Sequence, residues 1–291
     1  MKLIDINIQA LVCVTATRAF LINFLINGGF IMTINKGVKF VYANRTIDEF
    51  AMGLASAIGS ISRSGNVEDR NIITTQNVFS NRFNLHGIKY DKPLTFDLIL
   101  YKEDSSFINA DEERTLKKWL LCNRYDWLYV YDQADLSSVY YYCIASSAEM
   151  IDVGVYSGGL KITFVCDAPW AYSELIKRNY TCTSTLSLKL NTPIDFNQMI
   201  VYPSIVITAL SNGNITINNN TTGDSVVFNN CTNGEVIKVD FDADKISSTK
   251  DNIISRWNKK SFGFCDGLND ITLNGNFKIT IEYRLPIRVG A

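Results

Sequence analysis

The most constraining feature of the sequence is a regular series of glycine-containing turn signals in its C-terminal part. SNGN begins at position 211, TTGD at 221, TNGE at 232 and LNGN at 273. Short runs rich in β-branched and aromatic residues lie around these turns, and we expect strands at 204–208, 214–218, 225–228, 235–241 and 277–283. No long helical pattern separates these runs. The sequence therefore predicts an antiparallel β-sandwich rather than a parallel sheet with crossover helices.

The preceding part of the chain predicts a second β-rich block. Alternating apolar residues indicate strands at 38–42, 72–79, 95–101, 125–132, 138–148 and 160–164. A stretch at 53–70 is rich in glycine, serine and alanine, which is typical of a mobile loop. Pro169 lacks a backbone donor and ends the last of these strands. This strand end is the natural domain edge, and strands of the second block follow a polar stretch near 177–185. We expect an N-terminal ring-forming domain at 32–175 and a C-terminal β-sandwich domain at 176–291.

One helix is expected in the N-terminal block. Asn109 and Glu112 have the spacing of a capping box, in which each side chain accepts a hydrogen bond from the other residue's backbone amide. The apolar pattern at i, i+3 and i+4 then defines a buried stripe and stops near Asn123. The stripe consists of Leu116, Trp119 and Leu120. The predicted fold class is therefore mainly β, within the α+β group, with a single helix in the first domain.

The strand at 125–132 carries large residues on both of its faces. Trp127, Tyr129 and Tyr131 alternate with Leu128 and Val130. Such a strand is either covered on both faces inside its domain or lies at a contact between subunits. For the three aromatic residues we keep both alternatives, core strand or subunit contact.

Residues 1–31 are expected to form an extension outside either block. Their apolar run is interrupted by Arg18, Asn23 and Asn27, so no stretch of about 18 uninterrupted apolar residues is present for a membrane span. A secretory signal peptide would need a basic start and a small-residue cleavage site. Translation that begins at Met32 explains the segment better than a signal peptide, and we expect the extension to take no part in the fold.

Charge and cysteine content exclude several function classes. Lys and Arg total 28 against 29 Asp and Glu, with no basic cluster, so sequence-specific nucleic-acid binding is not expected. The 7 cysteines contain no C-x-x-C pair, which argues against a zinc or redox site. Their scatter and odd number indicate small buried side chains in a reducing cytosol. No phosphate-binding glycine motif occurs, so no nucleotide and no other cofactor is expected.

Candidate catalytic residues are few. His86 is the one histidine in the sequence, and we expect it to be a hydrogen-bonded structural residue in a strand-to-turn region. A carboxylate pair is the remaining catalytic option, but acidic residues at strand ends usually protect a sheet edge. These candidates are Asp97, Asp126, Asp132 and Asp167. Three further aspartates stand at alternate positions, Asp240, Asp242 and Asp244. They resemble the start of a calcium-binding loop, but the glycine and the final glutamate of such a loop are missing. We predict no catalytic site and no metal site.

One aromatic residue keeps a binding role open. Trp257 stands among polar residues in SRWNKKSF, and exposed aromatic residues of β-sandwich modules stack on sugars. The simpler interpretation is a rim residue that covers one end of the sandwich. We therefore retain a carbohydrate-binding module for cell-wall glycan as the alternative function, with Trp257 as the glycan or partner contact.

Several short motifs, taken in order, resemble those of siphophage distal tail proteins. The helix NADEERTLKKWLL leads directly into YDWLYVYD, and a later strand ends in FVCDAPWAYS. The family-like positions of that ending are Phe164, Cys166, Pro169, Trp170, Tyr172 and Ser173. The second block adds matches at 202–204, 234–235, 267–271 and 281–284. Together these segments cover most of 32–291, whereas 1–31 has no counterpart.

The resemblance implies a structural virion protein rather than an enzyme. Such proteins form a hexameric ring that joins the tail tube to the tail-tip hub, so contacts with further copies of the chain are expected. It also implies contacts with the tail tube protein, a tail-associated hub or lysin protein, and receptor-binding or baseplate proteins. The expected location is the tail tip of the virion, after synthesis in the host bacterial cytoplasm from a phage or prophage gene, with no membrane association.

Overall fold

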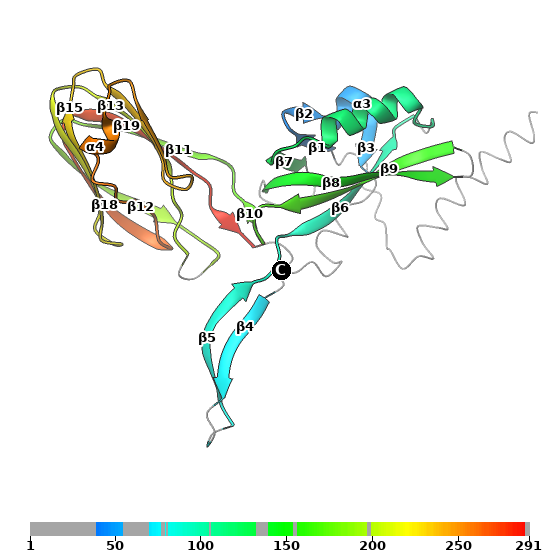
Figure 1. Cartoon of the computed structure of the whole chain (residues 1–291), viewed down its shortest axis with the longest axis horizontal. Coiled ribbons are helices and arrows are strands. Elements are labelled where there is room, and N and C mark those ends of the chain that lie inside the picture. The colour runs from blue at the N-terminus through cyan, green and yellow to red at the C-terminus, as the bar shows by residue number, and fades with distance from the viewer. Residues whose placement is uncertain are drawn as a thin grey trace, which may run out of the picture. The chain divides into compact units, whose positions relative to one another are not determined.

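The computed structural model describes residues 39–54, 70–76, 79, 81–104, 106–131, 139–153, 156–196 and 199–288. Most of these residues lie in antiparallel strands, and the predicted mainly β class with one substantial helix is confirmed. The chain divides into two compact units, one ending at Trp170 and the other running from Ala171 to Arg288 (Figure 1). The predicted extension at 1–31 and most of the predicted loop at 53–70 lie outside the described residues.

The first unit is built on one antiparallel sheet whose strands follow the order β2-β1-β7-β8-β9-β6-β3 (Figure 1). These strands are β1 (Lys39–Tyr42), β2 (Arg45–Thr46), β3 (Met52–Leu54), β6 (Thr95–Lys102), β7 (Asp126–Tyr131), β8 (Tyr140–Val153) and β9 (Tyr156–Cys166). The predicted hairpin between the strands at 125–132 and 138–148 is confirmed, because β7 pairs with β8. Alternate residues of these strands are buried, which places the hydrophobic core on one face of the sheet.

The helix α3 (Ala110–Leu120) forms where its capping box predicts. Asn109 Oδ1 accepts from the backbone amides of Asp111 at 3.1 Å and Glu112 at 2.9 Å, and Glu112 Oε2 accepts from the Asn109 amide at 2.9 Å. The helix ends slightly before the predicted Asn123. Its buried side chains are the predicted stripe, Leu116, Trp119 and Leu120. Capping therefore satisfies the first-turn donors while the stripe faces the core.

Trp119 packs the helix α3 against the sheet. Its ring stacks on Phe40 of β1 at 5.9 Å between centroids and on Phe50 of the short helix η1 (Ile47–Phe50) at 5.0 Å. Its indole N–H donates to the Tyr42 carbonyl at 3.0 Å. Phe164 of β9 meets the rings of Phe40 and Tyr42 edge-on in the same core. One aromatic cluster thus joins helix, η1 and sheet.

The strands β4 (Arg70–Gln76) and β5 (Phe83–Tyr90) form a separate two-stranded antiparallel sheet, which we call the arm (Figure 1). The predicted strand at 72–79 is thus shifted toward the N-terminus. The placement of His86 in a strand-to-turn region was wrong. His86 lies inside β5, which continues past Gly87 to Tyr90, and it is the residue that the pairing with β4 skips.

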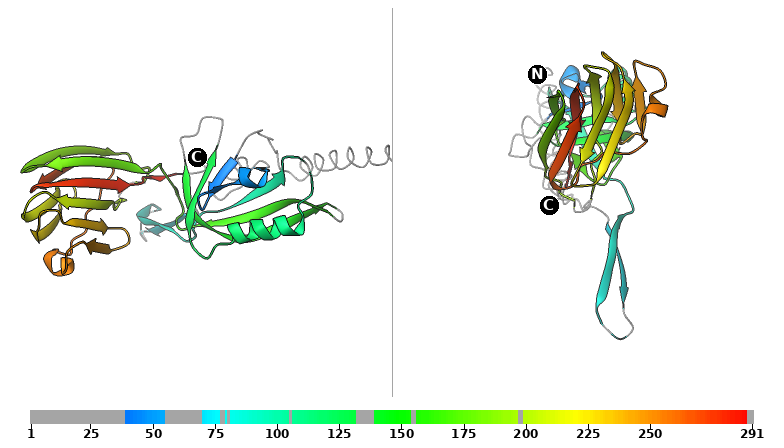
Figure 2. Two further views of the ribbon diagram at one scale, coloured as in Figure 1. Left: turned by 90° about the horizontal axis from the view of Figure 1, so that it is seen from above. Right: turned by 90° about the vertical axis from the view of Figure 1, so that its left-hand side faces the viewer.

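The second unit is the predicted antiparallel β-sandwich (Figure 2). One sheet has the order β11-β19-β13-β16-β17 and the other β12-β18-β14-β15. Their strands are β11 (Ile176–Cys182), β12 (Thr185–Thr192), β13 (Ser204–Ala209), β14 (Gly213–Asn219), β15 (Asp224–Cys231), β16 (Val236–Asp240), β17 (Lys245–Ser248), β18 (Gly267–Asn274) and β19 (Phe277–Tyr283). The short strands β10 (Ala171–Tyr172) and β20 (Pro286–Ile287) pair with each other, and a short helix α4 (Ile253–Arg256) precedes β18.

The prediction that the strands of the second block begin only after the polar stretch near 177–185 was wrong. Most of it belongs to β11, which pairs with β19 over its full length. Its polar residues Lys177, Arg178 and Asn179 are exposed in a row, and Cys182 at its end is buried. The sequence gives no alternating apolar pattern here, so the strand could not be recognised from periodicity.

Candidate interaction surfaces

Four aromatic residues form a continuous strip on the two central strands β7 and β8, and we call them the aromatic strip. Trp127 lies directly opposite Tyr142, and Tyr129 directly opposite Tyr140. The ring centroids are 4.8 Å apart in the first pair and 4.6 Å apart in the second. Each of the four side chains is partly exposed. Cross-strand aromatic pairs of this kind stabilise a sheet and leave part of each ring on the surface.

The other face of β7 belongs to the core. Leu128 between Trp127 and Tyr129 is fully buried. The strand is therefore buried on one face and partly exposed on the other. Tyr131 is the last residue of β7, and its side chain lies outside the described part of the structure. A contact between subunits through this strip stays a prediction.

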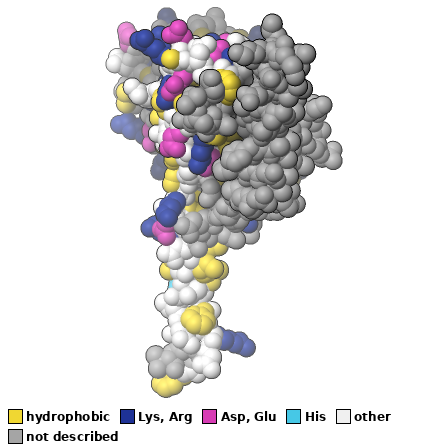
Figure 3. Space-filling view, turned by 90° about the vertical axis from the view of Figure 1, so that its right-hand side faces the viewer, with side chains coloured by type: hydrophobic (Ala, Val, Ile, Leu, Met, Phe, Trp, Pro, Cys, Tyr) yellow, Lys and Arg dark blue, Asp and Glu magenta, His cyan; other side chains and the backbone are white. Residues whose placement is uncertain are grey.

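The arm exposes large apolar side chains. Ile72 and Leu85 are each 62% exposed and Phe83 is 66% exposed. Figure 3 shows hydrophobic side chains along the arm with few charges between them. Monomeric soluble proteins seldom leave such a patch uncovered, so the arm is the second candidate interaction surface.

Two of the predicted carboxylate candidates, Asp97 and Asp126, make local structural contacts. Asp97 pairs with Lys161 at 2.9 Å and accepts a hydrogen bond from Thr163 at 2.6 Å. Asp126 pairs with Arg124 at 3.1 Å. The backbone amide of Asp167 donates to Tyr142, and Asp132 lies outside the described residues. Within the described ranges no group of three or more His, Cys, Asp or Glu side chains is placed to hold a metal ion.

The remaining polar candidates also have structural partners. His86 Nε2 lies 2.6 Å from the Thr75 hydroxyl across the arm. Asp240 Oδ1 accepts from the amides of Asp242 and Ala243, which makes a local turn. Burial, together with the neighbouring carboxylates of Asp240 and Asp244, raises the pKa of Asp242. In the part of the chain that the structure describes, no helix is both long and apolar enough to cross a membrane.

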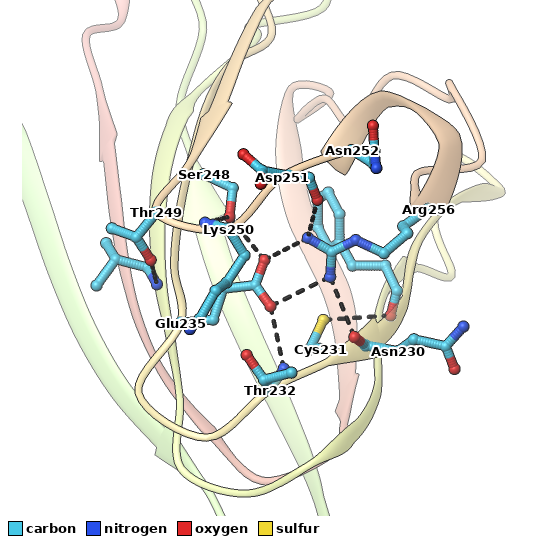
Figure 4. A network of polar contacts seen from close by, with 12 residues as sticks. Asn230, Cys231, Thr232, Glu235, Ser248, Thr249, Lys250, Asp251, Asn252 and Arg256 are labelled. Carbon is cyan, nitrogen blue, oxygen red and sulfur yellow. Dashed lines mark hydrogen bonds and ion pairs between the residues drawn. The ribbon is translucent and has the colours of Figure 1, made fainter.

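A buried ion pair in the sandwich was not predicted (Figure 4). Glu235 is fully buried and accepts two hydrogen bonds from the Arg256 guanidinium, at 2.6 and 3.1 Å. Ser248 and the Thr232 amide donate to the same carboxylate at 2.6 and 3.0 Å. All of these hydrogen-bonding partners belong to the second unit, so we assign the ion pair a structural role. No sequence motif signals it, because the two charges stand 21 positions apart.

Trp257 is the predicted glycan or partner contact, and that role stays a prediction. It is partly buried at the end of α4, bridges to Phe228 of β15, and its Nε1 atom is buried without a hydrogen-bond partner among the described residues. The described cysteines are free thiols, and four of them are buried.

The family-like ending of β9 has a structural role. Phe164 and Cys166 are fully buried in the core of the first unit, and the Trp170 ring meets Tyr90 at the base of the arm at 6.1 Å. Tyr172 lies in β10, just beyond Pro169. These residues therefore span the point at which one compact unit ends and the other begins.

Comparison with known proteins gives matches over both units. Family models described as a phage tail protein N-terminal domain and a phage tail C-terminal domain match residues 35–168 and 170–283. The structure is similar to the Dit protein of phage SPP1, described as a paradigm of the hub adsorption apparatus in phages that infect Gram-positive bacteria. The TM-score is 0.61 at 11% identity, over 86% of this chain and 100% of that one.

A chain of the phage P2 baseplate in its activated conformation with Ca is also similar. Its TM-score is 0.53 at 10% identity, over 85% of this chain and 98% of that one. At such identities the likeness establishes the fold alone. No curated protein matches the sequence.

Proposed function

Because the chain belongs to a family of phage tail proteins, matched in both of its domains, we propose that it is a structural subunit of a distal tail ring. The ring joins the tail tube to the tail-tip hub and to the receptor-binding apparatus. The observation that carries the proposal is the fold of the chain, which is similar to that of a hub protein of phage SPP1 over the whole length of that protein.

We assign the ring-forming role to the N-terminal domain at 32–175 and the docking of baseplate or receptor-binding proteins to the sandwich at 176–291. Six copies, as in the family that the sequence resembles, close a ring when one surface of each copy binds a different surface of the next. The aromatic strip supports this role because partly exposed aromatic rings are enriched in the cores of protein interfaces. The tail tube protein and a hub or lysin protein are the proposed axial partners.

A structural role without catalysis fits the polar groups described above. Asp97, Asp126, Asp240 and His86 are held by local ion pairs, hydrogen bonds or a turn, which is how structural side chains are satisfied. Glycan binding through Trp257 is the weaker alternative, since its indole N–H is turned into the protein.

Antibody labelling of intact virions tests the location. Gold particles coupled to an antibody against the sandwich should cluster at the end of the tail away from the capsid. An antibody against the tube protein, which should label along the tail once the particles are disrupted, serves as the control. Label on the capsid, or no chain in purified virions, would contradict the proposed role.

A further inference from the structure

The four-stranded sheet of the sandwich has one closed edge and one open edge. Its strand order is β12-β18-β14-β15, so β15 and β12 are its outer strands. Figure 2 shows the green strands β11 and β12 at one side of the sandwich and the orange helix α4 at the other. Half of the backbone groups of an edge strand point away from the sheet, and they need a cover, a partner strand or water.

The closed edge is β15, which Asn258 covers. The Asn258 amide donates to the Val227 carbonyl at 3.1 Å, and its side-chain Oδ1 accepts from the Val227 amide at 3.2 Å. Its Nδ2 group donates to the Ser225 carbonyl at 2.8 Å. Asn258 thus occupies the backbone groups that a further strand would use.

The open edge is β12, which pairs with β18 and with no other strand of the described residues. The Gly275 amide donates to the Ser184 carbonyl at 2.8 Å, so these two residues form a hydrogen-bonded pair next to the first pair of the ladder. Such pairs alternate with non-hydrogen-bonded pairs along an antiparallel ladder. The backbones at 186, 188 and 190 therefore bond to β18. Those that point away from it belong to Ser187, Lys189 and Asn191.

Little protects this edge against the addition of a strand. Among the described residues, none hydrogen-bonds to the backbones of Ser187, Lys189 and Asn191. The strand is eight residues long, and Lys189 is its single charged residue. By contrast β11, an outer strand of the other sheet, carries Lys177 and Arg178 in sequence. Charged side chains are a common means of blocking an edge, so β12 is the less protected of the two.

The open edge also leaves part of an apolar row uncovered. Leu186, Leu188 and Leu190 alternate with the exposed residues of β12 and lie on its core side. Leu190 is buried, whereas Leu186 and Leu188 are only half-buried. A strand added beside β12 would place its own alternate side chains next to these two leucines and cover them.

We propose that β12 receives an extended segment of a baseplate or receptor-binding protein as the fifth strand of its sheet. This inference rests on the proposed docking role of the sandwich and names the contact that performs it. Outward N–H and C=O groups at every second residue match the backbone of another extended segment, and the side chains beside them select its sequence. The half-buried leucines select apolar side chains at alternate positions of that segment.

A second copy of this chain fits the edge less well. Two β12 strands paired with each other would form a self-complementary contact, which closes as a dimer and not as a ring. The pairing would also bring Lys189 of both copies onto one face of the joined sheet, where like charges repel each other. A segment of a different protein avoids both conflicts.

Two substitutions at one outward position test the added strand. In the full chain, Ser187→Pro removes an outward N–H and leaves the bonds to β18 in place, since an edge strand tolerates proline where its N–H faces solvent. Ser187→Ala keeps that N–H and is the matched control. Each variant is titrated with the purified baseplate and receptor-binding proteins of the same virion. The proline variant should bind at least tenfold more weakly, and the alanine variant should match the wild type. Thermal unfolding checks that the sandwich stays folded.

Amide hydrogen exchange on the wild-type complex tests the same edge without a substitution. In the free chain the amides of Leu186 and Leu188, which bond to β18, should exchange slowly, and those of Ser187 and Lys189 should exchange fast. Binding should slow the exchange of the Ser187 and Lys189 amides at least tenfold. The same slowing in a concentrated solution of the chain alone would assign the edge to a second copy and overturn the proposal.

A complex that tolerates Ser187→Pro, or in which the outward amides of β12 still exchange fast, would overturn the added strand and leave docking on the sandwich intact. If none of these proteins binds the chain, the docking role of the sandwich is itself contradicted.

Discussion

Glu235 carries the clearest pH dependence of the molecule. Burial alone would raise the pKa of Glu235, but hydrogen bonds from Arg256, Ser248 and the Thr232 amide outweigh it and lower the pKa to about 2 from an ordinary 4.5. A depressed folded-state pKa gives stability that is fully present above the unfolded value and is lost as the pH falls from about 4.5 toward 2. The shift corresponds to about 3 kcal/mol at neutral pH.

Glu235→Gln should therefore lower the free energy of unfolding of the sandwich by about 3 kcal/mol at pH 7, because Arg256 keeps a buried charge without its counterion. Denaturant titrations between about pH 7 and pH 3 measure this, and the difference from the wild type should shrink toward the acid end. Glu282→Gln, at the partly exposed Lys177–Glu282 pair, is the control and should cost less than about 1 kcal/mol. A constant difference across the pH range would show that the carboxylate is not the cause.

Trp127 tests the aromatic strip at the level of one side chain. It is partly exposed and packs on Tyr142, so Trp127→Ala should leave the first unit folded but weaken ring formation. Tyr180→Ala, at a partly exposed aromatic residue of β11, should leave assembly unchanged. Circular dichroism reports the fold and light scattering the oligomer. Unaltered folding together with unaltered assembly of the Trp127 variant would remove the strip from the interface.

Among the elements, α3 depends on its cap. Asn109 accepts two backbone hydrogen bonds at the start of the helix, and Asn109→Ala should cost about 1 kcal/mol of stability in the first unit. Asn109→Asp should restore most of this loss, because aspartate caps as well as asparagine and complements the helix dipole. Equal losses in both variants would mean that packing of Asn109, rather than capping, matters.

The elements also show how far sequence patterns reach. The helix α3 and the strands between glycine turns were predicted because capping residues and turns act locally. The strand β11 was missed because its polar outer face gives no apolar run. The arm escaped prediction for another reason. The apolar residues of β4 and β5 look like those of a core strand, and only the structure shows that Ile72, Phe83 and Leu85 are exposed and that the strand pairing skips His86.

On the scale of the whole molecule, the two compact units should unfold separately. Calorimetry of the full chain should show two transitions, of which Glu235→Gln shifts only the one that belongs to the sandwich. Phe164→Ala removes a large side chain from the aromatic core of the first unit. It should lower the stability of that first unit by roughly 3–5 kcal/mol and shift only its transition. A single transition that both variants shift equally would mean that the units fold as one.

The candidate site could be predicted only in part. Trp127 and Tyr129 stood out because a strand with large residues on both faces is unusual, and the structure places them on the partly exposed face of β7. The resemblance to phage tail proteins could be recognised from a series of short motifs that occur in the same order over both blocks. The Glu235–Arg256 pair depends on which distant residues meet, which no local pattern encodes.

The mass and symmetry of the purified full chain test the central proposal most directly. Native mass spectrometry with negative-stain imaging should give six copies in a ring with an open centre, formed either by the chain alone or on addition of the tail tube and hub proteins. A chain that stays monomeric in the presence of both partners, or that forms a closed dimer through a self-complementary contact, would contradict the distal tail ring.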